Sequence, residues 1–225
     1  MSAPITPVTV TALYVLSHTL AAPLLQRVTY PWEALEELGE FIRRLGGSLP
    51  AAEYETPAPG VWVHKTARVA PTAYLGEGTI IGPGTEVRHG AFIRGNALVG
   101  GGCVVGNSTE LKNVILFDGV QVPHYNYVGD SVLGHLAHMG AGAITSNVKN
   151  DKSTVTVHAG ESPLDTGRRK VGAMLGDRVE VGCGTVLNPG AVVGKRARVY
   201  PLSSVRGYVP PDSIYKRQGE VATQR

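Results

Sequence analysis

The sequence has few aromatic and few charged residues for its size. Aromatic residues make up 6% and charged residues 17% of the 225 residues, while 43% are apolar. A chain of this length and apolar content can bury a core, so the sequence predicts a folded domain rather than a disordered one. The formal net charge is only +3, and the longest basic run is Arg168-Arg169-Lys170. A nucleic-acid partner is therefore not expected.

Cysteines and long apolar runs are also scarce. The two cysteines, Cys103 and Cys183, lie far apart, so they do not indicate a disulfide framework. No apolar stretch reaches the roughly 18 residues of a membrane-helix candidate, and the first residues lack the basic and apolar regions of a secretory signal. The sequence therefore predicts a cytoplasmic protein without a membrane partner.

Glycine, in contrast, is abundant. The 29 glycines make up about 13% of the chain, against a usual share of about 7%. They do not recur every third residue, so the chain is not collagen-like. The glycine excess instead indicates many repeated turns.

A six-residue repeat of aliphatic residues accompanies these glycines. Its leading positions are Val63, Val69, Leu75, Ile81, Val87, Ile93, Val99, Val105 and Leu111. The fourth position after a leader is usually small, as at Ala67, Ala73, Thr79, Thr85, Ala91, Ala97, Cys103 and Thr109. A period of six fits neither a helix nor simple strand alternation, but it fits short strands joined by tight corners. The repeat therefore predicts an all-β solenoid, a parallel β-helix, with both small and aliphatic positions pointing inward.

The repeat is interrupted at two kinds of place. Steps of five, such as Leu111 to Leu116, indicate β-bulges, which often lie beside functional sites. The pattern is lost over about 147–170 and resumes at Leu175. We expect this stretch to form a projecting loop, because long segments without repeat character are usually functional.

The two ends of the chain differ from the repeat. Residues 1–60 are expected to form a helical cap or linker, 61–209 the β-helix and 210–225 a C-terminal tail. A helix is predicted over about 31–45, with Pro31 in its first turn and Gly46-Gly47 at its end. One face of this helix is apolar, through Leu35, Leu38, Phe41, Ile42 and Leu45. Because the ends of a solenoid must be capped, we expect this face to dock on the open first coil.

Three segments carry a resemblance to a known family. The stretch 105–147, which contains VGNSTELKN, VPHYNYVGDSVLG and MGAGAITSN, resembles the acetyltransferase domain of the bifunctional glucosamine-1-phosphate N-acetyltransferase/UDP-N-acetylglucosamine pyrophosphorylase. The later DTGRRKVGAMLGD and the earlier YPWEALEELGEFI are similar to the C-terminal domain, and to the helix preceding it, of sugar-phosphate nucleotidylyltransferases. The resemblance spans about 30–217 and implies a left-handed β-helix, although crossovers are usually right-handed.

The resemblance also implies roles for individual residues. It makes His124 the general base, gives Asn147 a contact with the sugar, and assigns the backbone N–H near Ala141 to the thioester oxyanion. Arg94 and Lys112 would clamp a phosphate, and Tyr127 and His138 would contact the sugar. Acetyl-CoA would lie near Cys183 and Pro201, with its phosphates met by Lys195, Arg196, Lys216 or Arg217.

The implied activity is an acetyl-CoA-dependent N-acetyltransferase acting on an amino-sugar phosphate. The family resemblance predicts a homotrimer with its site between subunits, and no metal is expected. The stretch before residue 60 is too short for a nucleotidyltransferase domain, so a name with pyrophosphorylase in it would rest on the shared β-helix. Two positions depart from the acetyltransferase pattern, since His138 replaces an Asn and Val148 replaces a Tyr.

Two other functions remain open at this point. The first is a non-catalytic β-helix that assembles with, or regulates, a separate sugar-phosphate nucleotidylyltransferase. The second is a metalloenzyme resembling γ-class carbonic anhydrases, because the imidazoles of His89, His124, His135 and His138 are of the type that zinc prefers.

Overall fold

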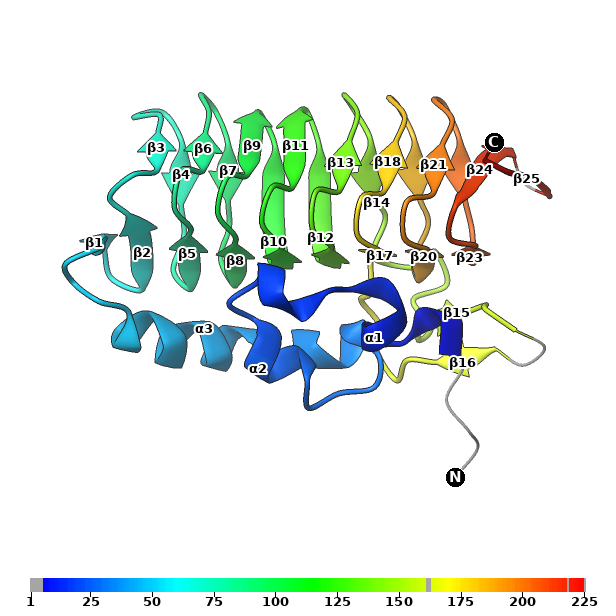
Figure 1. Ribbon diagram of the computed structural model, residues 1–225, viewed down its shortest axis with the longest axis horizontal. Helices are drawn as coiled ribbons and strands as arrows, with labels where there is room; N and C mark the ends of the chain where they lie inside the picture. The colour runs from blue at the N-terminus through cyan, green and yellow to red at the C-terminus, as the bar shows by residue number, and fades with distance from the viewer. Residues whose placement is uncertain (1–5, 161–162, 218, 225) are drawn as a thin grey trace.

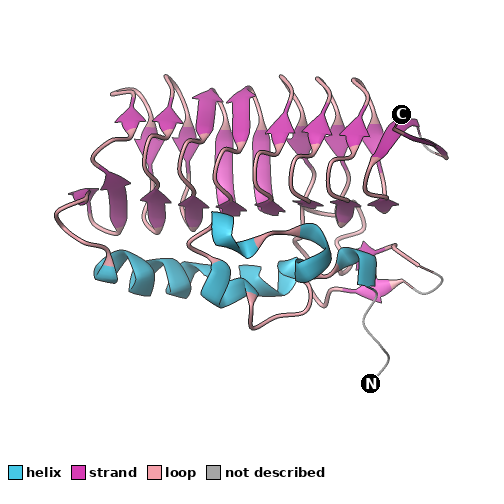
Figure 2. Cartoon of the chain, in the orientation of Figure 1, coloured by secondary structure: helices cyan, strands magenta, loops and turns pink. Residues whose placement is uncertain are grey.

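The chain folds into a left-handed parallel β-helix of about eight turns (Figure 1), as the sequence predicted. The computed structural model describes residues 6–160, 163–217 and 219–224. Each turn contributes one short strand to each of three sheets, and helices run along one side of the solenoid (Figure 2). Within the described ranges, no helix is long and apolar enough to cross a bilayer.

The three sheets are named here by what lies on their outer faces. The covered sheet consists of β2 (Val61–His64), β5 (Thr79–Ile81), β8 (Ala97–Val99), the second halves of β10 (Glu110–Leu116) and β12 (Tyr127–Leu133), β17 (Ala173–Leu175), β20 (Ala191–Val193) and β23 (Tyr208–Val209). The charged sheet consists of β3 (Arg68–Val69), β6 (Glu86–Val87), β9 (Val104–Asn107), β11 (Gln121–His124), β13 (His138–Met139), β18 (Glu180–Val181), β21 (Arg198–Val199) and β24 (Ser213–Arg217). The mixed sheet consists of β4 (Tyr74–Leu75), β7 (Phe92–Ile93), the first halves of β10 and β12, β14 (Ile144–Thr145), β19 (Val186–Leu187) and β22 (Ser204–Val205). At the two ends, β1 (Tyr54–Ala58) and β25 (Glu220–Thr223) pair antiparallel with β2 and β24.

The repeat residues fill the inside of the solenoid. Equivalent leaders stack in register from coil to coil, as Val63, Ile81 and Val99 do in the covered sheet. The leaders are buried except in the first coil, where Val69 and Leu75 are half-buried beside an apolar cavity of about 270 Å³. Small residues alternate with these aliphatic side chains because the narrow triangular interior has no room for large rings.

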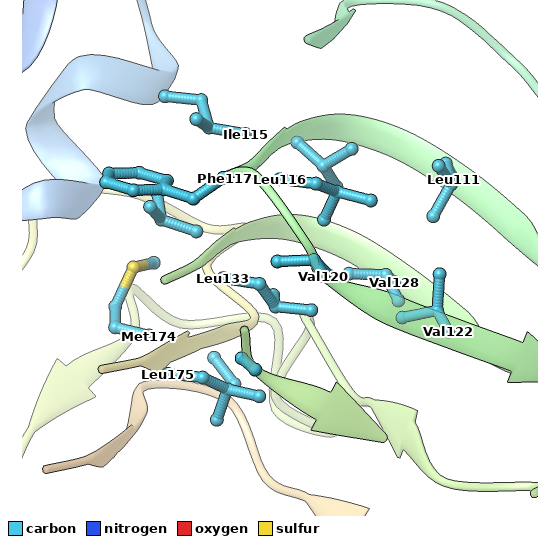
Figure 3. Close-up of a cluster of buried hydrophobic side chains, with 14 of the residues drawn as sticks. Leu111, Ile115, Leu116, Phe117, Val120, Val122, Val128, Leu133, Met174 and Leu175 are labelled. Atoms are coloured by element: carbon cyan, nitrogen blue, oxygen red, sulfur yellow. The ribbon is translucent and has the colours of Figure 1, made fainter. Parts of the chain in front are cut away.

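The covered sheet is apolar on its outer side as well. Its outward-facing residues form one ladder, Trp62, Ile80, Leu98, Ile115, Val132, Met174, Val192 and Tyr208. All of them are buried except the half-buried Trp62 and Tyr208. Figure 3 shows Ile115, Phe117 and Met174 lying toward the helical side, away from the interior residues such as Val122 and Val128. A sheet with two apolar faces needs a second layer, because otherwise one face would be exposed to water.

The N-terminal segment supplies this second layer, which we call the helical cover (residues 6–48). Its elements are η1 (Thr6–Val8), α1 (Val10–Leu13), η2 (Leu16–His18), α2 (Ala22–Leu25), η3 (Pro31–Leu35) and α3 (Leu38–Ser48). Helix α3 lies against β5, β8 and β10, and η3 lies against β12 (Figure 1). Docking of the helix on the open first coil was therefore wrong, because the apolar ladder attracts it to the side of the solenoid.

The boundaries of this helix also differ from the prediction of 31–45. Residues 31–35 form the 3₁₀ helix η3, and α3 continues through Gly46-Gly47 to Ser48. Gly46 lies inside the helix and does not end it. Its lack of a side chain allows the helix to approach Trp62 closely. A Cβ atom built there would lie 2.3 Å from a ring carbon of Trp62.

The described residues of the stretch 147–170 lie beside the helical cover and the later coils. The stretch leaves and rejoins the solenoid at one point, where the Val171 N–H donates to the Asn147 carbonyl at 3.0 Å. Between these residues, β15 (Thr156–Val157) and β16 (Leu164–Asp165) form an antiparallel pair beside the later coils (Figure 1). Val155 and Val157 are fully buried, and Arg168 reaches Glu36 of the helical cover at 3.2 Å.

The steps of five in the repeat are corners with one residue fewer, and the predicted bulges are absent from β10 and β12. Each of these strands continues from the mixed sheet around the corner into the covered sheet, and the two pair without a shift of register. The corner residues are Asn113 and Asp130, with φ angles of 54° and 49°. Asn and Asp adopt this left-handed conformation more readily than other non-glycine residues do.

Two neighbouring glycines of α3 test the cover. Gly46→Ala should lower the free energy of unfolding by about 1–3 kcal/mol, because the new methyl group overlaps the Trp62 ring. Gly47→Ala is the matched control, since a Cβ there meets nothing within 4 Å and alanine favours the helix by up to about 1 kcal/mol. Urea denaturation of both variants measures the difference, and an unchanged Gly46→Ala protein would contradict the close contact.

Candidate functional site

A buried carboxylate organises the edge where the mixed sheet meets the covered sheet, which we call the cation edge (Arg94, Lys112, Asp130 and Asn147). The Asp130 side chain is 3% exposed, and both of its oxygens accept from the Lys112 ammonium, at 2.9 and 3.1 Å. The Asn113 amide donates to one oxygen at 2.9 Å and the Asn147 amide to the other at 2.6 Å. These donors satisfy the buried charge, and Asp130 fixes the positions of Lys112 and Asn147 together.

Tyr127 connects this edge to the mixed sheet. It lies on the outer face, with Glu110 and Ile144 as its neighbours in the adjacent strands. Its hydroxyl accepts from the Asn147 amide at 3.2 Å. Partial burial, followed by the negative charges of Asp130 and Glu110, raises the pKa of the Tyr127 phenol above its usual value. Tyr127 therefore keeps its proton at neutral pH and can donate it in a hydrogen bond.

Arg94 lies on the cation edge one coil before Lys112. Its guanidinium donates to the Glu110 carboxylate at 2.9 Å, and both side chains are partly exposed. Only one of its terminal nitrogens is used in this pair. The predicted phosphate-binding pair, Arg94 and Lys112, is thus brought to neighbouring coils with N–H donors still available.

The second group of predicted residues follows the edge between the charged and mixed sheets, which we call the histidine edge (His89, His124, Ala141, Cys183 and Pro201). Backbone hydrogen bonds connect its successive corners: Gly142 N–H to the His124 carbonyl at 3.0 Å, Gly184 N–H to Ala141 at 2.8 Å, and Leu202 N–H to Cys183 at 2.8 Å. His124, Ala141, Cys183 and Pro201 therefore stand in one row, about one coil spacing of 4.8 Å apart.

The backbone around His124 is fixed by Asn126. This buried amide accepts from the His124 N–H at 3.0 Å and donates to the carbonyls of Gly140 and Ala143, both at 2.9 Å. The His124 side chain is exposed, and its imidazole has no partner in the part of the chain that the structure describes. The Ala141 N–H at the next corner is likewise unpaired with any described residue. The His124 imidazole and the Ala141 N–H, neither of which has a partner among the described residues, thus lie at neighbouring corners.

Other predicted residues lie away from these two edges or are paired. His138 is on the outer face of the charged sheet and pairs with Glu180 at 2.8 Å, so it does not join Tyr127. Lys195 and Arg196 lie at the third edge, between the covered and charged sheets, where Arg196 binds Asp212.

The last two predicted cations lie in the final coil, next to the histidine edge. Lys216 and Arg217 end β24, next to the Tyr200–Pro201 corner, and both pair with Glu220, at 3.3 and 2.6 Å. They therefore lie at the C-terminal end of the histidine edge, and a ligand would compete with Glu220 for them.

The histidines considered as zinc ligands are dispersed. His89 binds Thr72 at 2.7 Å, and His135 stacks on His18 with ring centroids 3.8 Å apart. Among the described residues, no group of three or more His, Cys, Asp or Glu side chains could hold a metal ion.

Two contributors to the site were not assigned a role from the sequence. Asp130 lies in the VGD segment, but its burial follows only from the corner geometry. Arg43 belongs to α3, far from the motifs, yet it lines a cleft of about 370 Å³ with Arg94 and Lys112. The spacing of the repeat could not reveal Arg43, because the repeat does not say where the helix docks.

Comparison with known proteins places the chain in a family. Residues 83–208, more than half of the sequence, match the family model described as the GMPPB C-terminal domain. The chain belongs to this family. The matched region begins in the second coil and ends in β23, so it includes the residues that define the cation edge and the histidine edge, while Lys216 and Arg217 lie beyond it.

Two curated relatives of the chain show how partial the match is. The chain is 35% identical over 109 residues to a bifunctional sugar-1-phosphate nucleotidylyltransferase/acetyltransferase of Sulfurisphaera tokodaii, covering 48% of this chain and 27% of the relative. It is 32% identical over 120 residues to the bifunctional protein GlmU of Methanococcus maripaludis, covering 53% and 29%. The chain thus matches less than a third of the length of either relative.

Solved structures resemble the chain at lower similarity. One is a hexapeptide transferase family protein from Anaplasma phagocytophilum, with 17% sequence identity and a TM-score of 0.42. The likeness covers 73% of this chain and 79% of the other, and it is too low in both measures to bear on function.

Replacing the buried carboxylate tests its organising role. Asp130→Asn keeps the shape and tolerates the same φ angle, but it removes the charge that binds Lys112. We expect the free energy of unfolding to fall by about 2 kcal/mol, since hydrogen bonds to charged groups contribute about 1.5–3 kcal/mol. The control is Glu110→Gln, which removes a partly exposed carboxylate and should cost about 0–1 kcal/mol. Equal losses in urea denaturation would contradict the role of Asp130.

The two cysteines should differ sharply in reactivity. Burial raises the pKa of the Cys103 thiol to about 12, so it contains almost no thiolate at pH 8, whereas Cys183 is exposed. Iodoacetamide should modify one thiol in the native protein and two in guanidinium chloride, and native Cys183→Ser should not react. Modification of Cys103 in the native state, detected by peptide mass spectrometry, would contradict its burial.

Proposed function

We propose that this chain is an acetyl-CoA-dependent N-acetyltransferase acting on an amino-sugar phosphate. The observation that carries the proposal is the row of His124, Ala141, Cys183 and Pro201 along one edge, opposite the cations of the other edge. The name of the Sulfurisphaera relative, which includes acetyltransferase and sugar-1-phosphate, supports the same activity.

The acceptor sugar is proposed to lie on the outer face of the mixed sheet. Lys112 and Gly129 are register partners, so the first half of β12, on the order of 10 Å long, and the corner at Tyr125 separate the cation edge from His124. With its phosphate at Arg94 and Lys112, the sugar ring rests near Tyr127 and Asn147, and its amine points toward His124. Tyr127, as a neutral donor, can hydrogen-bond a sugar hydroxyl.

The chemical step needs a base and an oxyanion donor beside the thioester. The amine nitrogen attacks the acetyl carbonyl carbon, while the neutral His124 imidazole takes a proton from that nitrogen. The carbonyl oxygen becomes negatively charged and accepts from the Ala141 N–H. When the tetrahedral intermediate collapses, the C–S bond breaks, the amide forms, and coenzyme A leaves as the thiol with the proton from His124.

Coenzyme A is proposed to follow the histidine edge toward the C-terminal coils. Its thioester lies at Ala141, its pantetheine passes the small corner at Cys183 and the corner at Pro201, and its phosphates meet Lys216 and Arg217. Displacement of Glu220 from these two cations accompanies binding.

A homotrimer is proposed as the active assembly. The mixed sheet exposes an aromatic pair, Tyr74 and Phe92, which are 60% and 43% exposed with ring centroids 5.5 Å apart. Exposed rings on a sheet face are suited to burial against another subunit. Such a neighbour would roof the acceptor site and complete it.

An acetyl-transfer assay with two histidine variants tests the proposal. N-acetylated product is measured by mass spectrometry with glucosamine 1-phosphate, galactosamine 1-phosphate and free glucosamine. His124→Ala should lower kcat by about 10²–10⁴-fold, the usual contribution of a general base. His89→Ala is the matched control, because it removes another exposed histidine from the same edge and should leave kcat unchanged.

Protection of Cys183 gives a reading that does not depend on turnover. Coenzyme A should slow alkylation of Cys183 in the wild type and in His124→Ala alike. Absence of both product and protection would overturn the proposal and favour a non-catalytic partner of a separate nucleotidylyltransferase. Protection together with equal kcat in wild type and His124→Ala would remove His124 as the base.

A further inference from the structure

A cleft opens between helix α3 and the cation edge. It has a volume of about 370 Å³ and is lined by Arg43, Glu77, Arg94, Gly95, Asn96 and Lys112. Three cations and one carboxylate thus surround one solvent-filled space. Cations that converge in this way repel each other, so an anion is the ligand that this charge distribution favours.

Close contact of α3 with the solenoid places Arg43 in the cleft. Gly39 lies on the Asn96 corner, where a Cβ atom would come within 2.7 Å of the Asn96 side-chain oxygen. One turn later on the same face is Arg43, and Gly46 follows against Trp62. Gly39 and Gly46 therefore hold the helix close to the Asn96 corner and to strand β2, on either side of Arg43. This fixes the place from which the Arg43 side chain extends.

All three cations have donors to spare. Lys112 uses two hydrogen bonds on Asp130, and Arg94 uses one terminal nitrogen on Glu110. The Arg43 guanidinium makes no hydrogen bond or ion pair with any residue in the described ranges. A phosphate monoester carries close to two negative charges and three acceptor oxygens, which matches one donor group from each of the three side chains.

We infer that Arg43 is a third phosphate-binding residue, so that the helical cover forms part of the acceptor site and the enzyme selects sugars with a phosphate monoester. This rests on the proposed function for the identity of the sugar, but not for the phosphate site itself. The phosphates of coenzyme A are the other source of this chemistry. They are placed elsewhere, because the corners assigned to the coenzyme lie on the histidine edge.

Binding measurements with two arginine variants test the inference. Calorimetry on the full chain at low salt gives Kd for inorganic phosphate, glucosamine 1-phosphate and free glucosamine. Arg43→Gln should weaken both phosphates by about tenfold or more, since it removes a charged hydrogen-bonding partner. Arg44→Gln is the matched control, because Arg44 lies over the Phe41 ring at 6.0 Å and does not line the cleft. Free glucosamine should bind both variants as it binds the wild type.

The remaining outcomes separate this inference from the proposed function. Unchanged phosphate affinity in Arg43→Gln, with a thermal midpoint like that of wild type, would overturn the inference and leave acetyl transfer intact. A loss of coenzyme A affinity as large as the loss of phosphate affinity would assign the site to the coenzyme and also overturn it. A tenfold loss for phosphates alone supports the site even if no acetyl transfer is detected.

Discussion

Burial of one apolar ladder is the constraint on which the rest of this structure depends. The outward positions of the covered sheet, from Trp62 to Tyr208, are hydrophobic, so this sheet cannot face water as the charged sheet does. The helical cover and the stretch 147–170 bury it from opposite ends. Directional bonds fix the cover in place, since the Tyr14 hydroxyl donates to the Val132 carbonyl at 3.2 Å and Asp177 accepts from the Val15 N–H at 2.8 Å.

The position of the cover determines the chemistry available at the neighbouring edge. Helix α3 packs on the covered sheet. One side of the helix therefore lies next to the cation edge, where Arg43 lines a cleft with Arg94 and Lys112. A helix that capped the end of the solenoid would have left those two cations facing bulk water. The scaffold and the proposed phosphate site are thus consequences of the same hydrophobic contact.

The corners of the solenoid supply the remaining polarity. A coil has little space for large side chains inside, so functional groups collect at the corners, where the chain turns and where the Ala141 N–H has no partner among the described residues. At the two shortened corners, Asn113 and Asp130 adopt left-handed conformations, and the Asp130 carboxylate is buried beside Lys112. At another corner, Asn126 gives the His124 backbone a fixed place. Both arrangements use a buried polar side chain that is fully hydrogen-bonded, which favours a single conformation.

The sequence by itself determined that the chain forms a solenoid and which residues fill its interior. A period of six with aliphatic leaders and small partners is compatible with few other folds, because each side chain's direction follows from its place in the coil. The motif also indicated His124, Lys112 and Tyr127. Only the tertiary structure decided how these residues are distributed over two edges, that His138 lies on another face, and that Arg43 joins the cations. These facts depend on where the helix packs and how the coils stack. Such contacts join residues far apart in the chain, and no local pattern records them.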